Sequence, residues 1–169
     1  MKKYNSYFCD ECLSVNECIV SEFAKLTEKD YQQQTHFFHG RYENIYFEGS
    51  KIPGLNIILE KAVQFSKKVL NDDRELAYSF WFNVMKPGDI TTAHTHDDDD
   101  ELLSGVYYLK VPGNSGDLII GQGKEKEIIT PGEGMFIFFK PDVLHEVSVN
   151  KSNESRISVA FNFGVNQVL

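Results

Sequence analysis

Residues 135–163 read MFIFFKPDVLHEVSVNKSNESRISVAFNF and contain three short apolar runs separated by turn residues. The runs MFIFF, HEVSV and RISVAFNF are rich in β-branched and aromatic residues, which favour strands. In the last run every second residue is polar or small, and these residues share one face of a strand: Arg156, Ser158, Ala160 and Asn162. The opposite face is fully apolar, so we expect it to pack beneath helices.

The same texture extends back to residue 76. Four further runs are LAYSFWFNVM, SGVYYLKV, DLIIGQ and EIIT, and the turn sequences KPGD, VPGNSG and TPGEG each follow one of them. Seven such runs within residues 76–163 predict a β-sandwich or a flattened barrel.

Before residue 73 the pattern is helical. Apolar residues recur at intervals of three and four over 15–26, where Ser14 and Glu17 have capping-box spacing, and again over 53–70. We therefore expect a single domain, 1–169, that is mainly β, with a helical N-terminal part (1–75) packed on a β core (76–169).

Composition narrows the partners of the chain. It has 169 residues, 41% of them hydrophobic, which suits one globular domain, and a formal net charge of −8 argues against nucleic acid and anionic membranes. No segment approaches the roughly 20 apolar residues of a membrane span, and no signal-peptide pattern is present, so we expect a cytoplasmic protein. A small-molecule or peptide substrate fits best. The oligomeric state stays open, and a homodimer is compatible with the sequence.

Three cysteines, Cys9, Cys12 and Cys18, lie in the first 18 residues. An odd number cannot pair completely within the chain, so reduced thiols are the simpler interpretation. Cys9 and Cys12 also have zinc-like spacing, and Cys18, His36 or His39 would have to complete such a site. We favour a local loop without zinc.

The histidines of the β region point to a metal. On a strand, His94 and His96 would face the same side, and His145 lies at the start of a later strand that a barrel can bring alongside. Three ligands on one side of an ion leave positions open for substrate or oxygen, which is typical of a catalytic metal. The acidic run 97–101 between them reads mostly as a solvated loop.

Arg156 lies on the polar face of the last strand and would point into the barrel. A buried guanidinium needs an anionic partner, and its planar fork suits a carboxylate. From the residues alone, that carboxylate could belong to an Asp or Glu of this chain or to a ligand.

An ordered series of motifs resembles a known family. Trp81 with Asn83, Pro87-Gly88, His94-Thr95-His96, SGVYYLKVP, His145 and RISVAFN together resemble the non-haem Fe(II), 2-oxoglutarate-dependent oxygenases, in particular a bacterial and phage branch. The resemblance covers residues 76–163. It implies a double-stranded β-helix (jelly roll, cupin-like barrel) and hydroxylation of a substrate with release of succinate and CO₂.

The resemblance also implies roles for particular residues. Arg156 would bind the far carboxylate of 2-oxoglutarate, Ser158 would help through its hydroxyl, and Tyr108 would assist from another strand. Tyr107 would point to the opposite face. His94, His96 and His145 would be the Fe(II) ligands.

Two alternatives remain. A ligand set of His96, Asp98 and His145 would restore the two histidines and one carboxylate typical of non-haem iron. The residues from Gly88 to Glu101 also resemble the first half of a cupin motif, which would bind metal through Glu101 as well and make no use of 2-oxoglutarate. In a version of that alternative without catalysis, the barrel would only bind a small molecule, with or without a metal.

Overall fold

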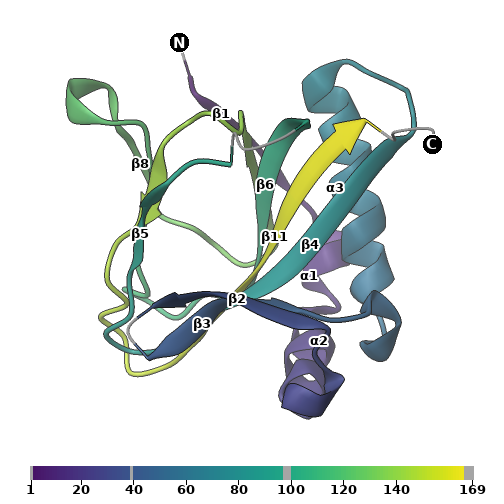
Figure 1. The fold of residues 1–169 in the computed structure, drawn as a ribbon, viewed down its shortest axis with the longest axis vertical. Coiled ribbons are helices and arrows are strands. Elements are labelled where there is room, and N and C mark those ends of the chain that lie inside the picture. The colour runs from purple at the N-terminus through teal and green to yellow at the C-terminus, as the bar shows by residue number, and fades with distance from the viewer. Residues whose placement is uncertain (1, 39, 97–99, 166–169) are drawn as a thin grey trace.

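The structure, a computed structural model, describes residues 2–38, 40–96 and 100–165. Two antiparallel sheets face each other, and the helices cover the outer side of the larger sheet (Figure 1). The predicted class, mainly β with N-terminal helices, is confirmed. In the described part of the chain, no helix is long and apolar enough to cross a membrane.

The larger sheet has seven strands. In spatial order they are β1 (Tyr4–Phe8), β9 (Met135–Phe139), β6 (Glu101–Lys110), β11 (Arg156–Val165), β4 (Leu76–Met85), β3 (Arg41–Tyr46) and β2 (Gln33–Phe38). The smaller sheet has four short strands, in the order β5 (Thr91–His94), β10 (His145–Val147), β7 (Leu118–Ile120) and β8 (Glu127–Ile129).

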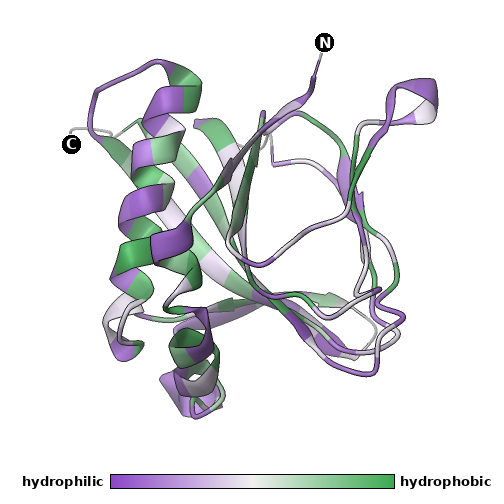
Figure 2. Ribbon diagram, turned by 180° about the vertical axis from the view of Figure 1, so that it is seen from behind, coloured by the Kyte–Doolittle hydropathy of each residue, from purple (hydrophilic) through white to green (hydrophobic). Residues whose placement is uncertain are grey.

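The helices are α1 (Asp10–Leu13), α2 (Asn16–Phe23) and α3 (Leu55–Leu70), with single 3₁₀ turns at Glu28–Asp30, Gly49–Lys51 and Gly123–Glu125. The buried residues of α3 follow the helical period: Leu55, Ile58, Ala62 and Ser66. Figure 2 shows hydrophobic and hydrophilic residues alternating along α3, as expected for a helix with one buried face. The predicted helix 53–70 therefore begins two residues late and ends where expected.

The main core lies between the helices and the larger sheet. Val159, Phe161 and Phe163 of β11 join Ile19 of α2 and Ile58 of α3 in it. The alternation of the last run thus has the predicted consequence: its apolar face packs beneath helices, and its polar face turns toward the smaller sheet.

The N-terminal part differs from the helical expectation, because β1, β2 and β3 also come from it. β1 pairs with β9 at one edge of the larger sheet, and β2 and β3 form a hairpin that pairs with β4 at the other. These strands are held by distant partners, which a local pattern does not reveal. The predicted capping box is also wrong, since the Ser14 hydroxyl donates to the Glu11 carbonyl and α2 begins after Val15.

The cysteines lie near the start of α1. Cys9 precedes the helix, and its Sγ accepts a hydrogen bond from the backbone N–H of Cys12 at 3.3 Å. Both side chains are buried, whereas Cys18 is exposed. Cys9 therefore lies in the short connection between β1 and α1, where it caps the helix.

Candidate metal centre and adjoining anion site

Three imidazoles converge between the sheets. His145 opens β10 and lies directly opposite His94, the last residue of β5. β5 ends there, so His96 is not on the strand as predicted; its backbone N–H donates to the Pro141 carbonyl at 2.8 Å. One ring nitrogen from each histidine lies within 4.8 Å of the others, and among the described residues this is the group that could hold a metal ion.

Backbone carbonyls orient two of these rings. Nδ1 of His94 lies 2.8 Å from the Thr92 carbonyl, and Nδ1 of His145 lies 3.0 Å from the Val143 carbonyl. A carbonyl accepts from an N–H, which fixes the proton on Nδ1 and leaves the lone pair on Nε2. That nitrogen is then available to an ion.

Burial keeps the rings of His96 and His145 neutral. It lowers the pKa of His145 from 6.5 to about 3 and that of His96 from 6.5 to about 4, and the neighbouring His94 adds to both shifts. Aromatic rings form part of the apolar surroundings, with Phe139 centred 4.6 Å from His145 and Trp81 5.8 Å from His96. Metal ligation requires the unprotonated imidazole, so near neutral pH these two rings are ready to bind.

Arg156 forms a second feature beside the histidines. Its side chain is buried, and Nη1 donates to the Gly116 carbonyl at 2.8 Å, but Nε has no hydrogen-bond partner. None of the ion pairs among the described residues includes Arg156. The guanidinium lies over the Tyr108 ring at 5.0 Å, and the Tyr108 hydroxyl is likewise buried without a partner. Burial raises the pKa of Tyr108, so the phenol remains a donor.

An unpartnered Nε–H on a buried guanidinium and an unpartnered buried hydroxyl together suit an anionic ligand. Of the two interpretations of Arg156, a pair within the chain is therefore not found among the described residues, and a ligand carboxylate fits. Ser158 follows on the same face of β11 and is also buried. Tyr107 points to the helices as predicted, where its hydroxyl donates to Asn16 at 2.6 Å.

One cavity of about 140 Å³ joins the two features. It is lined by the three histidines predicted to bind Fe(II) and by the three residues predicted to contact 2-oxoglutarate: His94, His96, Tyr108, His145, Arg156 and Ser158. The donor set fits both groups, with three imidazoles for a metal and unpartnered donors for a carboxylate.

The two alternative ligand sets, one with Asp98 and one with Glu101, have different outcomes. Asp98, the proposed carboxylate ligand, lies outside the described residues, as does His39. Glu101, which a cupin site would require, does not belong to the histidine group, and its Oε1 accepts a hydrogen bond from Asn162 at 2.6 Å.

The cavity wall also contains residues that the sequence did not single out for this site. His36, Glu43 and Asn44 reach it from β2 and β3. A signal for them would have required knowledge that this hairpin joins the edge of the larger sheet.

The sequence comparison gives a partial family match. Residues 79–128 match a family model described as "Putative 2OG-Fe(II) oxygenase". The matched segment contains His94, His96 and Tyr108, and it ends before His145 and Arg156. No curated protein matches the chain.

Solved structures share the fold over nearly the whole chain. A prolyl-4-hydroxylase from Pseudomonas putida is 18% identical with a TM-score of 0.74, covering 98% of this chain and 94% of its own. The 2OG complex of a viral collagen prolyl hydroxylase from Paramecium Bursaria Chlorella virus-1 is 21% identical with a TM-score of 0.60, covering 97% of each chain.

A third structure is a prolyl hydroxylase from Trichoplax adhaerens in complex with a hypoxia inducible factor peptide fragment. It is 11% identical with a TM-score of 0.68, covering 96% of this chain and 83% of its own. At these identities the structures establish the jelly-roll fold. Together with the family match, they confirm the predicted resemblance to 2-oxoglutarate-dependent oxygenases.

Proposed function

We propose that this protein is an Fe(II)- and 2-oxoglutarate-dependent oxygenase that hydroxylates a small-molecule or peptide substrate. One observation carries the proposal: three converging imidazoles and a buried guanidinium without an ionic partner line the same cavity. The family match over residues 79–128 supports it.

His94, His96 and His145 would hold Fe(II) through the ring nitrogens that the backbone leaves free. When bound, Fe(II) would couple the oxidative decarboxylation of 2-oxoglutarate by O₂, giving succinate and CO₂, to insertion of the second oxygen atom into a substrate C–H bond. The chain itself contributes the positions of the metal and the cosubstrate.

Arg156 would bind the far carboxylate of 2-oxoglutarate. Its Nε–H and the Tyr108 hydroxyl are two buried donors of the cavity wall that have no partner among the described residues, and a carboxylate accepts from both. Ser158 would donate a third hydrogen bond from the same strand. The buried, positively charged guanidinium of Arg156 would hold the far carboxylate in its planar fork. The other end of 2-oxoglutarate would then point toward the histidines.

The direct test is a titration of 2-oxoglutarate into the Fe(II)-loaded protein under anaerobic conditions, followed by metal-to-ligand absorption. We expect saturable binding in the wild type. If the folded, iron-loaded protein shows no measurable 2-oxoglutarate binding, the proposed oxygenase function is wrong.

Metal titrations of variants test the ligand set. His145→Ala should abolish tight Fe(II) binding, because three-point attachment becomes two-point. His36→Ala is the matched control, since His36 lines the cavity without belonging to the group, and it should retain the metal. Loss in His94→Ala supports three histidines, whereas loss in Asp98→Ala with retention in His94→Ala supports the carboxylate set.

A further inference from the structure

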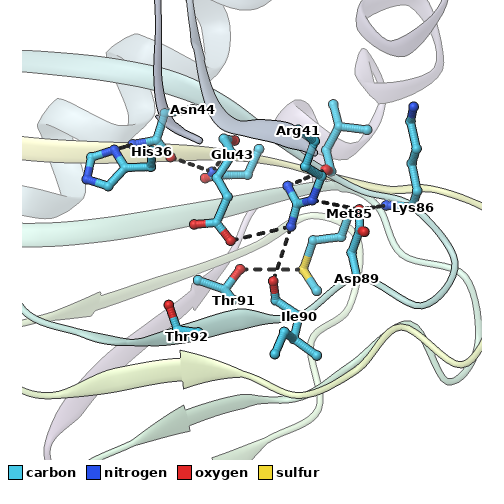
Figure 3. Close-up of polar contacts among 12 residues, drawn as sticks. His36, Arg41, Glu43, Asn44, Met85, Lys86, Asp89, Ile90, Thr91 and Thr92 are labelled. Atoms are coloured by element: carbon cyan, nitrogen blue, oxygen red, sulfur yellow. Dashed lines mark hydrogen bonds and ion pairs between the residues drawn. The ribbon is translucent and has the colours of Figure 1, made fainter. Parts of the chain in front are cut away.

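A buried carboxylate, Glu43, lines the same cavity and has no role in holding iron or 2-oxoglutarate. It lies on β3, outside the segment that matches the family model. Figure 3 shows its carboxylate pointing across the gap between the sheets, toward Thr91 and Thr92.

Among the described residues, the charges around Glu43 do not balance. Arg41 is the cation beside it, at 3.4 Å from Nη2 to Oε1, but Arg41 lies closer to Asp89, at 2.8 Å from Nε to Oδ2 (Figure 3). Arg41 also donates to the carbonyls of Val84 at 3.1 Å and Ile90 at 3.2 Å. Two carboxylates therefore share one guanidinium, and Glu43 has the longest contact with it.

The negative charge of Glu43 is not fully compensated by Arg41, and Arg156 does not compensate it either. All three side chains of the cluster are at most 17% exposed, so water does little to compensate the surplus negative charge. No ion pair among the described residues joins Glu43 to Arg156. A buried carboxylate that faces a cavity with incomplete compensation is complementary to a cation.

Neighbouring side chains hold the cavity wall around Glu43 in place. Asn83 donates to the Glu43 carbonyl at 2.8 Å and to Oδ1 of Asn44 at 2.9 Å, which fixes β3 against β4. Thr91 and Thr92 of β5, in the opposite sheet, line the same cavity, and the Thr91 hydroxyl donates to Met85 Sδ at 3.9 Å. The hydroxyl oxygens of these threonines are neutral acceptors beside the carboxylate. An ammonium or a guanidinium has several N–H donors and therefore needs several such acceptors.

We propose that Glu43 binds a cationic group of the primary substrate, an ammonium or a guanidinium, at the end of the cavity between β3 and β5. That this cation belongs to a substrate rests on the proposed oxygenase function. The substrate class is then an amine- or guanidine-bearing compound, which includes basic side chains of a peptide.

Two probes of equal shape test the charge preference. n-Butylguanidinium and its neutral counterpart n-butylurea are titrated into the metal-free protein at about 0.15 M salt, where long-range attraction to the acidic surface is screened. Binding is followed residue by residue through backbone amide shifts. We expect the cation to bind about tenfold more tightly or better, with shifts concentrated on β3 and β5.

Matched variants localise the effect. Glu43→Gln should reduce the affinity for n-butylguanidinium to that for n-butylurea. Glu60→Gln makes the same change of charge on the exposed face of α3 and should leave the preference intact. Equal affinity for the two probes, shifts scattered over the surface, or a preference that survives Glu43→Gln would each overturn the proposal.

A purely structural role for Glu43 gives a different pattern. If its pair with Arg41 served only the fold, Glu43→Gln would lower the melting temperature and leave probe binding unchanged, which would also overturn the proposal. The measurement needs neither iron nor 2-oxoglutarate. A failed 2-oxoglutarate titration would therefore remove the oxygenase assignment without changing this result, and the converse also holds.

Discussion

Replacing Arg156 with alanine is the sharpest test of the cosubstrate site. The guanidinium is 3% exposed, and only its Nη1 is engaged, by the Gly116 carbonyl, which leaves a fork free for a carboxylate. Hydrogen bonds to charged groups contribute about 1.5–3 kcal/mol each, so two of them contribute about 3 kcal/mol at the low end. We therefore expect Arg156→Ala to weaken 2-oxoglutarate binding by roughly a hundredfold or more.

The assay is the anaerobic titration of 2-oxoglutarate into Fe(II)-loaded protein, with melting temperature and iron content measured for each variant. Arg156→Lys should recover part of the loss, because a point charge replaces the fork. Arg74→Ala, which removes an exposed guanidinium paired with Asp72, should bind like the wild type. Unchanged 2-oxoglutarate affinity in folded, iron-loaded Arg156→Ala protein would refute the reasoning.

Two further predictions concern stability. Since the pKa values of His96 and His145 fall from 6.5 in the unfolded chain to about 4 and about 3 in the folded protein, the unfolded chain binds more protons between these values. The metal-free protein should therefore lose stability as the pH falls from about 6.5 toward 4. In denaturant titrations, the free energy of unfolding of His145→Gln should fall less steeply with pH than that of the wild type. An equally steep fall in the variant would contradict a lowered pKa for His145. In the SGVYY motif, a Cβ at Gly105 would lie 2.7 Å from the Phe138 ring, so Gly105→Ala should cost about 1–3 kcal/mol of unfolding free energy, whereas Gly113→Ala, with open space around it, should cost far less. Equal melting temperatures for the two alanine variants would show that the ring moves aside.

The β core and the convergence of the histidines could be predicted because their signals are local and periodic. The run 76–85 matches β4 residue for residue, and alternation along 156–163 separated the core face of β11 from the cavity face. Spacing alone suggested that His94 and His96 lie together, and they do, although β5 ends at the first of them.

The hairpin of β2 and β3 and the edge strand β1 could not be predicted in the same way. β1 has no buried residue of its own and exists because β9 offers it hydrogen bonds from more than 120 positions away. Glu43 gave no signal either, since its significance depends on Arg41 and Asp89 meeting beside a cavity. Local pattern shows which residues form strands, but it does not show which strands become neighbours.

The polar groups that line the cavity come from two sheets whose strands differ in length. The histidines come from β5, β10 and the segment that follows β5, on the smaller sheet, whose strands are three or four residues long. Arg156 and Tyr108 come from ten-residue strands of the larger sheet. A metal and cosubstrate held by both sets would act as a cross-link between the sheets. Amide exchange should then slow mainly in the short strands when both are bound, so occupancy of the site would govern how often the weaker wall of the barrel opens.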